Sequence, residues 1–177
     1  DANGLLLVSI WSSKKVEVFD RDKKAYECLT GDHPNEVTVS KDNRYAYVAC
    51  ANDNTVSVLD LQKKKAVASV GTAIHPDAPE GSTTNSVCLS ADEKTILAAN
   101  ADNNSLTVVD VRNPLQPRPL GFIPAGWYPT KVMLLKDNTV LVMNGKGSRS
   151  MANPKGEYIG GLMEGSLSIF QYPEAKE

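Results

Sequence analysis

Residues 48–60 read VACANDNTVSVLD, and residues 98–110 repeat the phrase as AANADNNSLTVVD. A weaker copy, VSIWSSKKVEVFD, occupies residues 8–20. The aspartates that end the three copies, Asp20, Asp60 and Asp110, are spaced 40 and then 50 residues apart. A period of about 40–50 residues made of short strand patterns is typical of β-propeller blades. Because one such unit cannot bury both of its faces alone, the repeat predicts sheets stacked around an axis.

Alternating apolar and polar residues around each copy predict up to four short antiparallel strands per repeat, named a to d from the innermost outward. The predicted blades cover residues 5–29, 36–71, 86–123 and 131–171. The first lacks strand a and the last lacks strand d. The whole chain, 1–177, is therefore predicted to be an all-β partial propeller of about three and a half antiparallel blades. A closed ring typically has about 4–8 blades, so we expect a fragment of a larger ring.

The composition excludes several classes of partner. The chain has 23% charged residues and a net charge of −2, so nothing favours binding to nucleic acid. No apolar run approaches the roughly 18 residues that a membrane-spanning helix needs. The three cysteines, Cys28, Cys50 and Cys88, show no paired spacing, and we interpret the latter two as buried free thiols within strands.

The strand order places the loops from d to a and from b to c on one face of the ring, here called the top face. The unusual sequence is found in these loops, at residues 72–85, 124–130 and 145–164. Long loops on a rigid scaffold commonly carry function, so the top face is the predicted binding surface. The candidate ligand- or partner-binding residues are His75, Asp77, Glu80, Trp127, Tyr128, Lys146, Arg149 and Tyr158.

No catalytic residue is predicted, because no serine or cysteine has a base placed near it by any motif. We interpret His33 and His75, each followed by a proline, as loop-capping or packing residues rather than metal ligands. Trp127 and Tyr128 either stack on a ligand or pack beneath the next loop. No metal site and no cofactor are predicted; His75, Asp77 and Glu80 are too few ligands to indicate a cation site.

Several stretches carry a family resemblance. Residues 47–49 (YVA) and 52–58 (NDNTVSV) resemble the YVTN-type propeller repeat. Residues 75–85 (HPDAPEGSTTN), 121–130 (GFIPAGWYPT) and 144–147 (NGKG) resemble the propeller half of bacterial bifunctional proteins. In those proteins a seven-bladed YVTN propeller precedes an alkaline-phosphatase-like phosphoesterase domain. The phosphatase motifs match nothing in this chain.

The resemblance implies a non-catalytic scaffold, or a ligand- or partner-binding module, of a hydrolase of the phosphoesterase class. Its partners would be the missing blades and the C-terminal phosphatase-like domain, with self-association through open blade edges as a further expectation. The implied location is periplasmic, secreted or on the cell surface. Two alternatives are a propeller-type sugar-lactone hydrolase and a surface-layer or adhesion module. We expect the chain alone to have no enzymatic activity.

Overall fold

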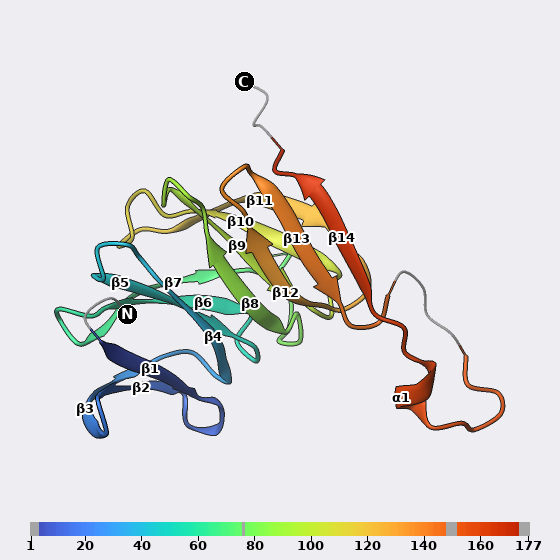
Figure 1. Ribbon diagram of the computed structural model, residues 1–177, viewed down its shortest axis with the longest axis horizontal. Coiled ribbons are helices and arrows are strands. Elements are labelled where there is room, and N and C mark those ends of the chain that lie inside the picture. Colours follow the sequence, from blue (N-terminus) through green and yellow to red (C-terminus); the bar gives the residue numbers. More distant parts are fainter. Residues whose placement is uncertain (1–3, 76, 148–151, 174–177) are drawn as a thin grey trace.

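The computed structural model describes residues 4–75, 77–147 and 152–173, and its regular structure is almost entirely β (Figure 1). Four antiparallel sheets follow one another in chain order. The first contains β1 (Leu5–Ile10), β2 (Lys15–Asp20) and β3 (Lys23–Leu29). The second contains β4 (Pro34–Val39), β5 (Tyr45–Cys50), β6 (Thr55–Asp60) and β7 (Lys65–Gly71).

The third sheet contains β8 (Thr84–Leu89), β9 (Thr95–Asn100), β10 (Ser105–Asp110) and β11 (Arg118–Pro124). The fourth contains β12 (Pro129–Leu134), β13 (Thr139–Asn144) and β14 (Ser166–Gln171). Two short helices, η1 (Trp11–Ser13) and α1 (Ile159–Leu162), lie in connecting segments. No helix in the described ranges is long and apolar enough to cross a membrane. The predicted all-β partial propeller is confirmed.

The innermost strands begin two residues before the positions expected from the apolar pattern. The observed starts are Pro34, Thr84 and Pro129, against expected starts at residues 36, 86 and 131. A proline can begin a strand because its missing N–H is not needed there. Successive innermost strands β4, β8 and β12 lie side by side and define the inner wall of the arc.

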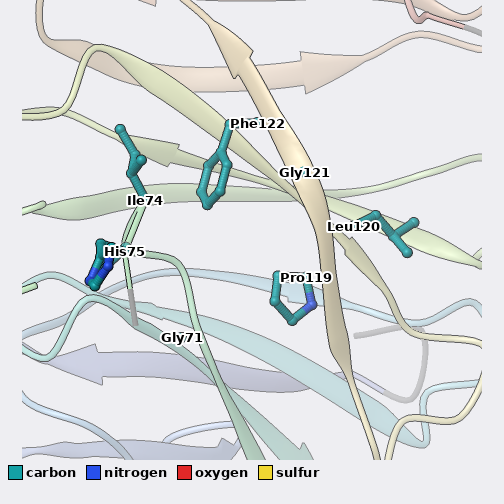
Figure 2. Close-up of a pocket in the computed structure, with 8 residues that line it drawn as sticks. Gly71, Ile74, His75, Pro119, Leu120, Gly121 and Phe122 are labelled. Carbon is teal, nitrogen blue, oxygen red and sulfur yellow. The ribbon is translucent and has the colours of Figure 1, made fainter. Parts of the chain in front are cut away.

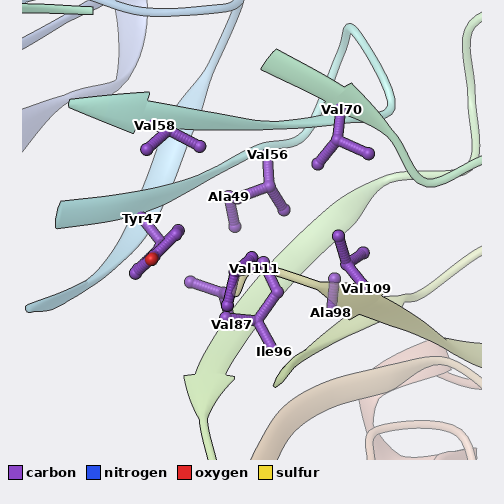
Figure 3. Close-up of a cluster of buried hydrophobic side chains, with 10 residues drawn as sticks. All are labelled: Tyr47, Ala49, Val56, Val58, Val70, Val87, Ile96, Ala98, Val109 and Val111. Atoms are coloured by element: carbon purple, nitrogen blue, oxygen red, sulfur yellow. The ribbon is translucent and has the colours of Figure 1, made fainter. Parts of the chain in front are cut away.

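Apolar side chains fill the space between neighbouring sheets. The cluster between the second and third sheets contains ten buried residues, among them Tyr47, Val56 and Ile96 (Figure 3). Equivalent clusters lie between the first and second sheets and between the third and fourth. Valine and alanine dominate because β-branched and small side chains pack well between closely stacked strands. The two middle sheets therefore bury both faces, and each depends on its neighbours.

Two backbone hydrogen bonds, here called the top-face lock, recur at the start of every innermost strand. They join the pair of residues before strand a, here called the lead-in pair, to the turn between strands b and c of the same sheet. The lead-in pairs are Asp32–His33, Ser82–Thr83 and Trp127–Tyr128. The second residue of each pair accepts from the N–H of Ala51, Ala101 or Gly145 at 3.0, 2.9 and 2.8 Å. The first accepts from Asn52, Asp102 or Lys146 at 3.3, 3.1 and 3.0 Å.

The preceding sheet holds each lead-in segment from its other side. The side-chain oxygen of Asn54 accepts from the N–H of Ser82 at 2.6 Å, and that of Asn104 accepts from the N–H of Tyr128 at 2.9 Å. In the weaker first repeat a salt bridge takes this place, with Lys14 Nζ 3.3 Å from Asp32 Oδ2. The same three turn positions have positive φ, which asparagine tolerates well. The repeated asparagines thus have a structural role in joining adjacent sheets.

A buried polar network reinforces the boundary between the second and third sheets. Asn100 donates through Nδ2 to the carbonyl of Thr72 at 2.9 Å and to Thr107 Oγ1 at 2.8 Å. Its Oδ1 accepts from the hydroxyl of Thr84 at 3.1 Å. All four residues are fully buried. Because buried polar groups are costly when unpaired, this network depends on every member.

Replacing Asn100 should therefore destabilise the chain. Asn100→Ala removes three hydrogen bonds inside the fold, and we expect it to lower the free energy of unfolding by about 1–3 kcal/mol. Asn52→Ala, at an exposed turn position, is the matched control and should change it by less than about 0.5 kcal/mol. Urea unfolding measures both. Equal effects of the two substitutions would contradict the assigned role.

The first and last sheets each expose large apolar side chains. Leu6 and Leu29 are 59% and 70% exposed, and Leu167 and Ile169 on β14 are 53% and 63% exposed. β14 is also an edge strand, with an unpaired row of backbone groups. Exposed apolar surface of this kind promotes association.

We therefore expect this chain to self-associate as its concentration rises. Light scattering across a wide concentration range should show a growing mean mass, and the double variant Leu167→Lys, Ile169→Lys should shift the onset to higher concentration. A monomer that persists across the whole range would contradict this expectation.

Candidate functional site

Six of the eight predicted top-face residues lie in two groups on different segments of the chain. The first lies on the segment between β7 and β8. Asn54 holds this segment, since its Nδ2 donates to the carbonyl of Pro79 at 3.1 Å and its Oδ1 accepts from Gly81 and Ser82. Asn54 therefore holds the segment both at Pro79 and at Ser82, the first residue of the lead-in pair.

Two adjoining cavities share the side chains of Ile74 and His75. The larger, about 490 Å³, lies between the end of β7 and the outer strand β11. Figure 2 shows Phe122 and Pro119 facing the segment that carries His75. The smaller, about 250 Å³, includes Glu80 in its wall. His75 and Glu80 therefore line the same smaller cavity, which also reaches Ser82 and Asn103, and His75 alone of the two borders the larger groove between the outer strands β7 and β11.

Asp77 contacts this group through its backbone. Its N–H donates to His75 Nδ1 at 3.2 Å. In the neutral imidazole the proton is then on Nε2, which becomes a donor. Within the described ranges, no group of three or more His, Cys, Asp or Glu side chains is arranged to hold a metal ion.

The second group contains Trp127, Tyr128 and Lys146. The ammonium of Lys146 lies 4.0 Å from the ring centroid of Tyr128, a cation–π contact. Trp127 and Tyr128 form a lead-in pair, so their backbone is held by the top-face lock. Trp127 remains 41% exposed. This group offers an aromatic surface and one cation at the start of β12.

Of the other two predicted residues, the structure describes only Tyr158, which joins neither group. Tyr158, 84% exposed, directly precedes α1, and Figure 1 shows α1 away from the four sheets. Arg149 lies outside the described residues. The assignment of the eight residues to a binding surface stays a prediction.

A third polar group on the top face was missed by the interpretation of His33 as a capping residue. The Nδ1 atom of His33 lies 2.8 Å from Asp32 Oδ1, and the ring of Trp11 packs perpendicular to the imidazole at 4.0 Å between centroids. Burial raises the pKa of the Asp32 carboxyl, but hydrogen bonds from Lys14 and His33 outweigh it, so the net pKa is below its usual range. This carboxyl is thus ionised at neutral pH. The sequence does contain one signal for this group: among the three lead-in pairs, only Asp32–His33 combines a carboxylate with an imidazole.

The inner wall carries a polar row that sequence reasoning also missed. Glu36, Ser86 and Lys131 occupy the third position of β4, β8 and β12. The buried hydroxyl of Ser86 donates to Glu36, and Lys131 forms an ion pair with the same carboxylate. Ser86 Oγ also accepts from the N–H of Val132 at 3.1 Å. The row therefore joins three innermost strands by capping their unpaired inner edges.

The three cysteines are free; of the two predicted to be buried free thiols, Cys50 is buried and Cys88 is partly buried. Burial raises the pKa of Cys88 to about 12, and it raises the pKa values of Cys28 and Cys50. Such thiols stay protonated at neutral pH and are poor nucleophiles. The polar chemistry of this chain therefore rests on its imidazole, carboxylate and ammonium groups.

Comparisons with solved structures show the same architecture. Hydrazine synthase of Kuenenia stuttgartiensis matches with a TM-score of 0.73 at 20% identity, covering 95% of this chain and 43% of that one. A protein from Lactobacillus plantarum gives 0.70 at 22%, covering 80% and 45%. The WD40 β-propeller domain of Doa1 gives 0.64 at 13%, covering 83% and 44%. At these identities the likeness concerns the fold alone.

This chain spans less than half the length of each of these structures. No curated protein matches it. A family model described as lactonase, seven-bladed β-propeller, matches residues 7–153, which is most of the 177 residues. The chain therefore belongs to the seven-bladed β-propeller lactonase family.

Proposed function

We propose that this chain supplies the ligand-binding top face of a lactonase-type propeller, and that the full-length protein opens a sugar lactone to the hydroxy acid. Membership of the lactonase family supports the choice of reaction. The chain itself contributes binding groups, and closure of the ring by further blades would complete the site.

One observation carries the proposal. The top-face lock is the same in the second, third and fourth sheets, whereas the side chains it holds differ completely, from Asp32–His33 to Ser82–Thr83 to Trp127–Tyr128. A constant backbone with varied side chains at one end of a scaffold is the usual arrangement of a binding face. The bottom turns instead repeat one motif, in which Ser40 and Ser90 each bond an aspartate two residues later.

The chemistry of the second group suits a polar ring. An exposed indole such as that of Trp127 can cover the apolar face of a sugar, and the ammonium of Lys146 can bind a carboxylate or another anionic substituent. The cation–π contact with Tyr128 holds the ammonium over the phenol ring, and a backbone hydrogen bond joins Lys146 to Trp127. The ring of a sugar lactone offers an apolar face to the indole and ester oxygens to the ammonium, and the hydroxy acid formed from it offers a carboxylate to the ammonium.

The phosphoesterase parent suggested by the sequence resemblance has no support from the family match, and neither does the surface-layer alternative. The phosphoesterase and lactonase hypotheses predict different surroundings for the top face. A phosphatase-like domain would cover it as a protein partner, whereas a lactone would leave it open to solvent.

Turnover of glucono-δ-lactone by the full-length protein, followed as proton release at constant pH, tests this proposal. Trp127→Ala should weaken substrate binding by about 1–3 kcal/mol, seen as a higher KM, because aromatic anchors contribute on this scale. Asn138→Gly, at a positive-φ turn on the bottom face, is the control and should leave KM unchanged.

The outcomes separate the candidate functions. No lactone opening by the full-length protein would overturn the proposed reaction. Opening with equal KM changes in both variants would retain the reaction and reject the top face as its binding surface.

A further inference from the structure

The lead-in pair Asp32–His33 has the geometry of a carboxylate–imidazole dyad. Ionised Asp32 can only accept hydrogen bonds, so the 2.8 Å contact requires a proton on His33 Nδ1. In the neutral ring, Nε2 then carries the free lone pair. The imidazole side chain keeps 23% of its surface exposed, which leaves room for a small molecule to approach.

Contacts from several elements fix this ring. The N–H of Asp32 donates to Asp53 Oδ2 at 2.7 Å, and the top-face lock holds the carbonyls of both residues. Trp11, in η1 of the first sheet, holds the ring by its perpendicular contact. The charged groups around the imidazole are thus Asp32 on its own segment, Lys14 after η1 and Asp53 in the β5–β6 turn.

The repeat itself supplies a structural control. Thr83 and Tyr128 occupy the position of His33 with φ values of 53° and 60°, against 53° for His33. Both make the same backbone hydrogen bond as His33. The top-face lock therefore does not require an imidazole, and Ser82 and Trp127 show that it does not require a carboxylate before it.

The place of the dyad also matters. His33 immediately precedes β4, an innermost strand, so it lies at the top end of the inner wall. Glu36 and Lys131 lie lower on the same wall. His33 thus stands at the entry to a strand of the inner wall, whereas the groove beside His75 lies between the outer strands β7 and β11.

From this geometry we propose that His33 is the general base of lactone opening, with Asp32 as its positioning residue. This inference rests on the proposed function. His33 Nε2 takes a proton from water as the water oxygen bonds to the lactone carbonyl carbon. The ring C–O bond then breaks, and the imidazolium returns the proton to the departing alkoxide, which gives the hydroxy acid.

The direct test is His33→Thr in the full-length protein, since the repeat shows that threonine fits this backbone. With glucono-δ-lactone we expect kcat to fall by about 100-fold or more, the usual contribution of a general base, with a small change in KM. Added imidazole should restore part of the rate. Asp32→Asn should lower kcat and alter the dependence of rate on pH.

Controls keep the outcomes distinct. Thermal unfolding of His33→Thr should match the parent, and Asn138→Gly should retain full activity. If the full-length protein opens the lactone but His33→Thr keeps kcat within threefold of the parent, the role of His33 is rejected and the proposed function stands. If the unsubstituted full-length protein opens no lactone, the proposed function is rejected, and the role of His33 with it.

Discussion

The top-face lock is the interaction on which the rest of this structure depends. In the second, third and fourth sheets, two N–H groups from the turn after strand b bond the carbonyls of the lead-in pair. These bonds extend the ladder between the first two strands beyond the strand ends, and they fix where the chain enters each sheet. Because the preceding sheet grips the same segments through Asn54, Asn104 or Lys14, the lock also sets how successive sheets meet.

This arrangement separates stability from function. Stability resides in backbone bonds, in the apolar layers between sheets and in buried groups such as Asn100. The side chains of the lead-in pairs are then free to differ, and they lie where the inner wall meets the top face. A repeat can therefore carry an acid–base pair in one blade and an aromatic surface in another without altering the fold.

Much of the fold was predictable because its determinants are local. Alternating apolar and polar residues predict the strands, and the turns after strand b are also local, because Asn54 and Asn104 adopt positive φ readily. Pro34 and Pro129 do not fit the alternating pattern, and the structure nevertheless begins β4 and β12 at these prolines, because the first residue of a strand does not need its N–H.

The polar groups were harder to predict because they join distant residues. Trp11 and His33 come from different sheets, so only the stacking of sheets brings them together. Glu36 and Ser86 are one 50-residue repeat apart, but Lys131 follows after 45, which obscures their shared position. His75 borders the groove at the outer edge together with residues of β11, and the sequence alone does not place these residues side by side.

Native-state hydrogen exchange of single amides tests the top-face lock most directly. If the lock is as firm as the strands it extends, the amides of Ala51 and Ala101 should exchange only on global unfolding, like that of Val58 in the core. Exchange of Ala51 and Ala101 at the rate of an exposed turn amide such as Lys64, well before global unfolding, would show that the lock opens locally and does not hold the top face.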